Sequence, residues 1–220
     1  MVPGLSDPWR VFAGARDSIE LAAELGRSVG AILAEQHSRI SAADVADWLP
    51  RRLSWLKSPE WIRERLVKVV DDTKLRVRAD AVIEMYEAAT ISEGDRALVH
   101  TDVGFHNLGI DPASYEVCGI FDYDEAAWAD RHHDFRYLLF DFDRDELLNA
   151  ALSAYEAIVG RKIQLERVLL YDAACAITFL AYRAGTHPDE RSCGRTLEED
   201  LRWSRHAVAR ALASEGRHAS

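Results

Sequence analysis

A short segment near the middle of the chain carries side chains whose types and spacing suit phosphoryl transfer. His100, Asp102 and Asn107 form the pattern H-x-D-x-x-x-x-N. In catalytic loops with this spacing, the Asp accepts the proton of a substrate hydroxyl and the Asn holds a magnesium ion. A loop of this length lets two oxygen-bearing side chains reach one site from different directions. Transfer of a phosphoryl group to a hydroxyl is therefore the first functional hypothesis.

Two short apolar stretches after this loop predict a β-hairpin. Residues 107–110 and 116–121 flank a turn-forming cluster at 111–114. A turn centred between Ser114 and Tyr115 would pair Asn107 with Asp122, and directly opposed residues have Cβ atoms about 4.5–5.5 Å apart. Mg²⁺ takes oxygen ligands, so this amide and carboxylate are candidates to share one ion. Asn and Asp are also common turn and cap residues, and a one-residue change in the turn would break the pairing.

Helical periodicity dominates the rest of the chain, and these helices must position the segment. Asp17 as N-cap and Glu20 at the third helical position predict a helix down to about His37. Ser58-Pro59-Glu60 predicts the start of another helix, which runs to about Val70. Further helices are expected over 41–49, 79–89, 134–140, 144–158, 164–184 and 196–213. The expected fold class is α+β and mainly helical, with one small β insertion that carries the chemistry.

Composition narrows the function classes. The chain has 220 residues, 48% of them hydrophobic, with 27 Lys+Arg against 37 Asp+Glu and a net charge of −10. This length suits one domain, or two small ones, and the hydrophobic share excludes a disordered chain. An acidic chain is a poor nucleic-acid binder, since such binding rests largely on neutralising phosphates.

The cysteines and the hydropathy pattern exclude further classes. Three cysteines without a C-x-x-C pair predict neither a disulfide framework nor a zinc knuckle. The first residues lack the features of a signal peptide, and no apolar run approaches eighteen residues. We therefore expect a cytoplasmic protein with neither a nucleic-acid nor a membrane partner.

Residues 98–135 as a whole resemble the aminoglycoside phosphotransferase and choline kinase superfamily of small-molecule kinases. That superfamily's catalytic loop commonly reads H-G-D-x-x-x-x-N, and its later motifs read I-D-F-x-x-A and G-D-P-x-x-D-[LF]. The later motifs are matched here by Asp122, Ala126, Asp130, Asp134 and Phe135. The run from Leu33 to His37 is similar to the superfamily's helix that ends in L-x-x-x-H. Three positions depart from the pattern: Thr101 replaces Gly, His106 stands where Gly or Glu is common, and Arg131 replaces Pro.

The resemblance implies roles for five of these residues. Asp102 would be the catalytic base, Asn107 and Asp122 would bind Mg²⁺, and His100 and Asp134 would brace the loop. The phosphoryl donor would be ATP or another nucleoside triphosphate, and the acceptor a small molecule with a hydroxyl group. The sequence leaves open which acceptor is used and whether ATP or GTP is the donor.

The resemblance covers only the C-terminal catalytic lobe of such kinases. We interpret residues 1–220 as that single lobe and 1–15 as a remnant of the interlobe linker. No glycines ahead of Asp102 form the phosphate-covering G-x-G-x-x-G, and Lys57, Lys68 and Lys74 fall in expected helices or at their edges. The nucleotide-binding lobe is therefore expected to be absent, whether the chain is a fragment, starts late in its reading frame or has lost the lobe naturally.

Two expectations follow from a missing lobe. The 220-residue chain alone should be a weak enzyme or none, because clamping the phosphates is the larger part of phosphoryl-transfer catalysis. Apolar surface should also be exposed near the catalytic loop, and such patches tend to self-associate into homodimers.

Residues 121–146 are strongly acidic. They contain nine acids: Asp122, Asp124, Glu125, Asp130, Asp134, Asp141, Asp143, Asp145 and Glu146. A negative cleft beside the site would concentrate a cationic substrate, whereas the alternative is a solvated, solubilising face. Four aromatic residues have the same two interpretations, as a lining that stacks on a cation or as core: Trp128, Tyr137, Phe140 and Trp203.

Two other functions remain open. One is a non-catalytic binding module derived from a kinase. The other is a metal-dependent phosphohydrolase that uses an H-D pair at His133 and Asp134 with ligands from His100, His106 and Asp102, for which Mn, Fe or Zn would be the suitable metal.

Overall fold

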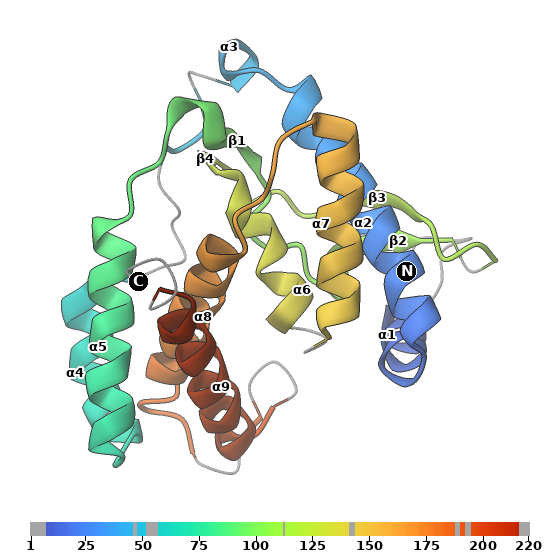
Figure 1. Ribbon diagram of the computed structural model, residues 1–220. Coiled ribbons are helices and arrows are strands. Elements are labelled where there is room, and N and C mark those ends of the chain that lie inside the picture. Colours follow the sequence, from blue (N-terminus) through green and yellow to red (C-terminus); the bar gives the residue numbers. More distant parts are fainter. Residues whose placement is uncertain are drawn as a thin grey trace. The chain divides into compact units, whose positions relative to one another are not determined.

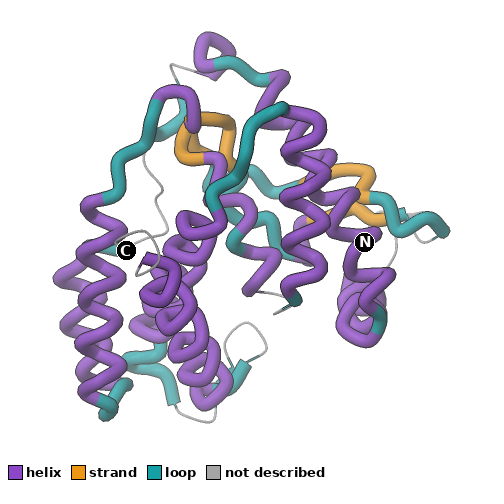
Figure 2. The backbone as a smooth tube through the Cα atoms, in the orientation of Figure 1, coloured by secondary structure: helices purple, strands orange, loops and turns teal. Residues whose placement is uncertain are grey.

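The computed structural model describes residues 8–45, 48–51, 57–111, 113–140, 144–187, 190–191 and 195–215. Helices make up most of this part of the chain, and two short sheets of two strands complete it (Figure 2). The mainly helical α+β fold is thereby confirmed. The chain divides into two compact units, formed by residues 1–53 with 91–164 and by residues 54–90 with 165–220. Among the described helices, none combines the length and apolar character needed to cross a bilayer.

The first unit is built around two packed helices, α2 (Ile19–Arg39) and α7 (Asp145–Val159), which lie side by side (Figure 1). Two short helices, α1 (Pro8–Asp17) and α3 (Ala42–Val45), flank α2 in the sequence. The N-cap of α2 is Ser18, whose Oγ accepts from the Leu21 amide at 3.2 Å. The prediction of Asp17 as cap is wrong by one residue because Asp17 ends α1, a helix that the sequence pattern did not reveal.

The first unit also holds both sheets. Strand β1 (Arg96–Val99) pairs with β4 (Ala127–Asp130), and β2 (Leu108–Ile110) pairs with β3 (Val117–Ile120), both antiparallel. The 3₁₀ turns η1 (Glu93–Asp95), η2 (Phe105–Asn107) and η3 (Arg131–Phe135) and the short helix α6 (Tyr137–Phe140) connect these elements. The predicted hairpin at 107–121 is confirmed, whereas β4 was missed because its four residues are all buried and show no alternation.

Close packing of α2 on α7 depends on Gly26 and Gly30, one helical turn apart. A Cβ atom on Gly30 would overlap the carbonyl oxygen of Ala151 in α7, and one on Gly26 would overlap that of Leu147. Both glycines are buried. The absence of a Cβ therefore sets how near the two helix backbones approach.

The substitution Gly30→Ala is expected to destabilise the first unit by about 1–2 kcal/mol. Backbone atoms cannot move aside cheaply, so the overpacking cost of about 1–3 kcal/mol or more exceeds the gain of about 1 kcal/mol in helix propensity. Urea unfolding measures the change. Gly119→Ala is the control, because its Cβ would meet nothing nearer than the Phe121 ring at 3.8 Å. Equal stability of the two variants would contradict the packing argument.

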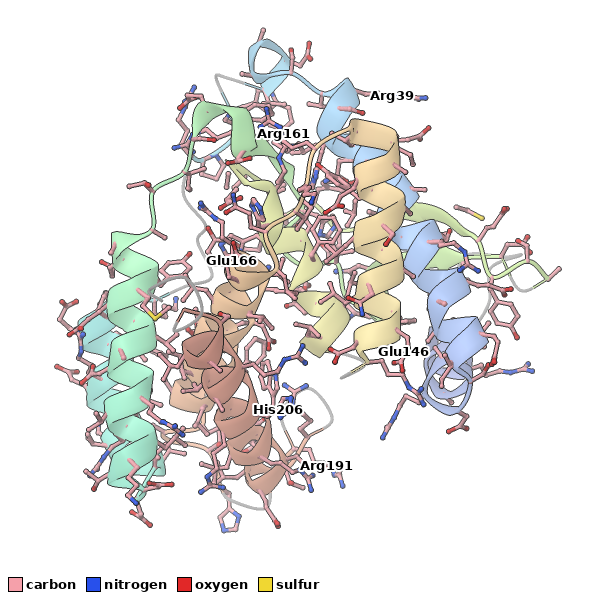
Figure 3. The ribbon with its side chains drawn as sticks, in the orientation of Figure 1. Arg39, Glu146, Arg161, Glu166, Arg191 and His206 are labelled. Atoms are coloured by element: carbon pink, nitrogen blue, oxygen red, sulfur yellow. The ribbon has the colours of Figure 1, made fainter. Side chains whose placement is uncertain are left out.

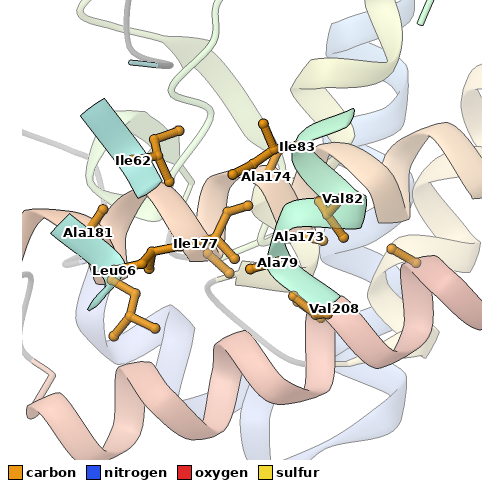
Figure 4. Packing of buried hydrophobic residues seen from close by; sticks show 14 of the residues in the cluster. Ile62, Leu66, Ala79, Val82, Ile83, Ala173, Ala174, Ile177, Ala181 and Val208 are labelled. Carbon is orange, nitrogen blue, oxygen red and sulfur yellow. The ribbon is translucent and has the colours of Figure 1, made fainter. Parts of the chain in front are cut away.

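The second unit is a helical cluster of α4 (Pro59–Val69), α5 (Thr73–Ala88), α8 (Leu165–Tyr182) and α9 (Leu197–Glu215). Ser58 caps α4 as predicted, accepting from the Trp61 amide at 3.3 Å. Helix α5 begins earlier than predicted because Asp72 caps it. The apolar core of this unit includes Ile62, Leu66, Val82, Ile177 and Val208 (Figure 4).

Two of the aromatic residues considered for a pocket lie in apolar cores. Trp128 is buried in a cluster with Val45 and Leu98, and Trp203 packs against the core of the second unit. Tyr137 is also buried. The side chain of Phe140 and the whole of Cys193, Asp141 and Asp143 lie outside the described part, as do residues 1–7.

Candidate active site

The loop from His100 to Asn107 leaves the end of β1 and is held at its start by Asp134. The carboxylate of Asp134 accepts hydrogen bonds from the amides of His100 at 3.0 Å and Thr101 at 2.9 Å. The same carboxylate accepts from Nε2 of His37 at 3.0 Å. All four residues are buried. Asp134 therefore fixes the backbone where the loop begins, although the two segments lie far apart in the sequence.

A chain of buried hydrogen bonds extends this contact. Arg131 donates to the hydroxyl of Tyr155 at 3.0 Å, and that hydroxyl lies 3.1 Å from Nδ1 of His37. Because the Tyr155 oxygen accepts from Arg131, its proton can point to His37, which places the His37 proton on Nε2, facing Asp134. Arg131 also donates to the Gly94 carbonyl at 2.5 Å. The arginine that replaces the family's proline is thus an anchor between η1, α7 and η3.

His100 joins the catalytic loop to the end of strand β3. Its Nδ1 accepts from the Asp102 amide at 3.2 Å, and its Nε2 donates to the Phe121 carbonyl at 2.8 Å. The ring packs edge-on against Tyr123, with 4.4 Å between centroids. The two hydrogen bonds require a neutral ring with the proton on Nε2. His100 therefore connects the backbone before Asp102 with the backbone before Asp122.

Asp102 lies at the surface of this frame with its carboxylate held from several sides. Nδ2 of Asn107 donates to its carboxylate at 3.1 Å and to its carbonyl at 2.8 Å, and Nε2 of His106 lies 3.2 Å from the carboxylate. The side chain remains 36% exposed. A carboxylate oriented by an amide and an imidazole, and open to solvent, can receive a hydrogen bond from a bound hydroxyl.

The pKa of Asp102 is lowered from 3.8 to about 2. Partial burial raises this pKa, but hydrogen bonds from His106 and Tyr137 and the positive charges of His106 and Arg136 lower it by more. Asp102 is therefore ionised at neutral pH. Its contribution to folding is complete above its unfolded pKa and is lost as the pH falls through about 2.

The register of the hairpin differs from the prediction by one residue. Leu108 faces Ile120, and the Phe121 amide donates to the Asn107 carbonyl at 2.9 Å, so Asn107 lies opposite Phe121 and not Asp122. The ladder shifts between Gly109 and Ile110, because β3 has one extra residue beside the turn. Asp122 is the next residue along and is exposed, with a φ of 67°.

The donor groups of Asn107 and Asp122 suit a magnesium ion. Asn107 is buried and uses its amide nitrogen to bind Asp102, so its amide oxygen points elsewhere. Among the described contacts, no hydrogen bond or ion pair engages the Asp122 carboxylate. Both groups offer the hard oxygen ligands that Mg²⁺ prefers.

Thr101 occupies a backbone conformation that favours glycine. Its φ is 73°, which explains why the related motif has Gly at this position. The conformation is held by a hydrogen bond from its hydroxyl to the Glu125 carbonyl at 3.0 Å and by Arg136, which donates to the Thr101 carbonyl. Arg136 is buried and also donates to the His133 carbonyl at 2.8 Å. Sequence reasoning missed Arg136 because a lone arginine after the D-F pair gives no signal of burial.

Comparison of Thr101→Gly with Thr101→Ala isolates this strain. Both variants lose the hydroxyl, but only alanine keeps a Cβ in the left-handed region, which costs about 1–2 kcal/mol. Thr101→Gly is therefore expected to be more stable than Thr101→Ala by about 1 kcal/mol, although glycine is also more flexible in the unfolded chain. Thermal denaturation of the two proteins gives the difference. A more stable alanine variant would show that the loop relaxes away from this conformation.

The ligand set of the alternative phosphohydrolase is not assembled. Asp134 is occupied by backbone amides and His37, His100 is bound to the Phe121 carbonyl, and His132 contacts Asp130. Within the described residues, no three His, Cys, Asp or Glu side chains are grouped so as to hold a metal ion. The arrangement of these side chains therefore does not favour the phosphohydrolase.

The described acidic residues of the stretch 121–146 differ in their exposure to solvent. Asp130 and Asp134 are buried and hydrogen-bonded to backbone amides. Asp122, Asp124 and Glu125 are exposed on the segment that follows β3. Phe121 and Tyr123 in the same segment are 46% and 40% exposed. These two side chains expose aromatic surface near the catalytic loop, whereas the expected apolar patch of a missing lobe stays a prediction.

The sequence matches the profile of a known protein family. Residues 5–171 match the sequence profile of the phosphotransferase enzyme family (APH). No curated protein sequence matches the chain.

Solved structures share the fold at low sequence identity. The GDP complex of wild-type aminoglycoside 2'-phosphotransferase-IIIa has a TM-score of 0.61 at 17% identity, with 89% of this chain and 66% of that chain covered. A choline/ethanolamine kinase family protein from Mesorhizobium loti has a TM-score of 0.60 at 16% identity, with 96% and 67% covered. The GDP and kanamycin complex of APH(2")-IIia has a TM-score of 0.55 at 15% identity, with 92% and 67% covered. The chain spans about two thirds of the length of these three structures.

Proposed function

The chain belongs to the phosphotransferase enzyme family, and from this premise we propose that it carries the catalytic residues of a small-molecule kinase. The observation that carries the proposal is the Asp102 carboxylate, oriented by Asn107 and His106 on a loop whose start is bound to Asp134. The donor would be ATP or another nucleoside triphosphate. The acceptor would be a hydroxyl of a small molecule, and the exposed acids at 122–125 would favour a cationic one. Residues 1–220 would correspond to the catalytic C-terminal lobe.

In the proposed reaction, Asp102 orients the acceptor hydroxyl. The hydroxyl oxygen forms a bond to the γ-phosphorus while the bond from that phosphorus to the bridging oxygen breaks, and the nucleoside diphosphate leaves with the electron pair. A carboxylate with a pKa of about 2 is a weak base. It therefore accepts a hydrogen bond first and takes the proton late, when the hydroxyl has become acidic through bond formation to phosphorus.

Asn107 and Asp122 would hold a magnesium ion, which when bound neutralises charge on the phosphates. Asn107 is preset for this role because Asp102 takes both of its described amide-nitrogen hydrogen bonds. Asp122 is exposed at the adjacent end of β3, next to the residue that pairs with Asn107.

Paramagnetic Mn²⁺ tests this site without any turnover. Added to ¹⁵N-labelled protein, it should broaden the amide signals around Asn107 and Asp122 at low ratios of metal to protein. Asp122→Asn should remove this selective broadening, whereas Asp124→Asn, two residues away and equally acidic, should retain it. Broadening that survives Asp122→Asn, or that centres on another acidic segment, would overturn the metal assignment.

Self-association is part of the proposal. Phe121 and Tyr123 offer exposed apolar surface beside the site, and such patches tend to associate. Sedimentation velocity over a concentration series should show a dimer that weakens in Phe121→Ser. A monomer at the highest concentration would refute the dimer.

A further inference from the structure

In the first unit the hairpin of β2 and β3 contacts helix α2 and projects beyond it (Figure 1). A groove lies between one face of α2 and the turn end of this hairpin. Its volume is about 680 Å³. One wall is a single face of α2, and the other is the turn and first residues of β3, with Ile158 of α7 at one side. None of the residues assigned to catalysis or metal binding lines it. The groove is therefore a candidate for a second binding site.

The walls of the groove are rigidly joined. Ser28 on α2 accepts a hydrogen bond from the Val117 amide at 2.6 Å, which ties the strand to the helix. Because this amide is already bound, a ligand cannot extend the sheet at Val117. The side chains that line the groove are therefore the groups considered for recognition.

The groove combines an apolar floor with an acidic rim. Ala31, Ile32 and Val117 supply apolar surface, and Glu24, Glu35 and Glu116 supply three carboxylates against the one guanidinium of Arg27. Glu24 makes no hydrogen bond or ion pair with any described residue. Glu35 pairs with Arg39 at 3.0 Å, on the last turn of α2 (Figure 3), but both side chains are more than half exposed. The sign of the rim selects a cationic ligand and disfavours a phosphate-bearing one.

The shape of the groove favours a long ligand. Glu24 and Glu35 are eleven residues apart on one helix, so they are separated by about 16 Å along its axis. Five residues of extended peptide span the same length. Small-molecule sites enclose most of their ligand, whereas Glu24, Arg27, Glu35, Glu116 and Cys118 on the rim are all exposed. A ligand bound in an open groove gains affinity by making contacts along its length rather than by being enclosed.

We propose that this groove docks an extended basic peptide segment of a partner protein, with two cationic side chains near Glu24 and Glu35 and apolar side chains between them. The groove is separate from the proposed kinase site, so the inference holds or fails independently of phosphotransferase activity. It assigns the family member a protein partner in addition to its small-molecule substrate.

Fluorescence anisotropy with a labelled peptide tests the proposal. The probe is Arg-Ala-Leu-Ala-Leu-Ala-Arg, in which both arginines and both leucines project from one face of an extended chain. Its charge-inverted control is Glu-Ala-Leu-Ala-Leu-Ala-Glu. Saturable binding is expected for the basic peptide only. The double variant Glu24→Lys/Glu35→Lys should weaken it about fivefold, because it replaces two attractive charge contacts by two repulsive ones. The matched control is Glu84→Lys/Glu198→Lys in the second unit, which has the same net charge and should bind as the unchanged protein does.

Alkylation of Cys118 by a reactive peptide shows whether the peptide binds in this groove. It is an exposed free thiol on the groove wall, whereas Cys175 is buried. A bromoacetyl group on the basic peptide should alkylate Cys118 faster than the same group on the acidic peptide, and peptide mapping by mass spectrometry identifies the site. The inference is overturned by absence of saturable binding, by equal affinity of the two double variants, or by equal alkylation rates. Displacement of the basic peptide by an equal concentration of spermine would also overturn it, in favour of a small polyamine site.

Discussion

Replacement of Asp102 by asparagine is expected to reduce the chain's phosphoryl-transfer rate by about 10²–10⁴-fold, the range for loss of a positioned general base. The variant keeps the size of the side chain and one oxygen that can accept from Asn107 or His106. It loses the negative charge that, in the proposed reaction, orients the acceptor hydroxyl and takes its proton. The effect should therefore appear in kcat, with little change in the affinity for nucleotide.

Single-turnover transfer from radiolabelled ATP is sensitive enough for a slow enzyme. The acceptor is chosen as the best of a panel of amino sugars and amino alcohols, and calorimetry supplies the nucleotide affinity. Asp124→Asn is the matched control, because it removes one exposed carboxylate of the same neighbourhood. Equal rates for Asp102→Asn and the unchanged chain would remove Asp102 from the mechanism, whatever the fate of the metal site.

Asp134→Ala is expected to produce the largest loss of stability in the first unit, about 3–5 kcal/mol. The substitution leaves the amides of His100 and Thr101 and the imidazole of His37 without their acceptor, in a region with no exposure. A buried donor without a partner costs about 1–3 kcal/mol. The strained Thr101 backbone loses one of its supports at the same time.

Amide hydrogen exchange locates this effect. Protection of the amides in α2 and β1 should fall by about a hundredfold or more, because each 1.4 kcal/mol is a factor of ten. Amides in α8 belong to the other unit and serve as the internal reference. Asp124→Ala should leave both sets unchanged, since exposed substitutions usually stay within about 0.5 kcal/mol. A uniform loss across both units would indicate general unfolding rather than failure of the loop support.

Local patterns in the sequence were sufficient for the elements with strong end signals. Ser58 followed by proline predicts the start of α4, and Gly160 ends α7 in the left-handed conformation that glycine adopts without strain. The hairpin was also predictable, because a turn-forming cluster separates its two strands. Such signals act over a few residues and do not depend on distant contacts.

The candidate site was predictable only as a set of residue types. The spacing of His100, Asp102 and Asn107, with Asp122 and Asp134 further along, identified the phosphotransferase family, which the profile match over residues 5–171 confirms. The sequence of this motif did not reveal that Arg136 and Arg131 are buried. It also did not reveal that Asp122 lies one residue past the pairing partner of Asn107. The pairing register of the β2–β3 hairpin is set by a bulge and by packing between the strands. Counting residues from the turn cannot predict either of these.

The sequence alone therefore determined the family, because the motif that identifies it is a local pattern of an acid and an amide at fixed spacing on one loop. Only the tertiary structure decided how Asp134 reaches back to His100 and Thr101, and how His37 and Tyr155 complete that support. These partners are separated by 33 to 118 residues. They meet because α2 and α7 bury their faces against each other, and burial then makes every unpaired polar group costly enough to select one arrangement.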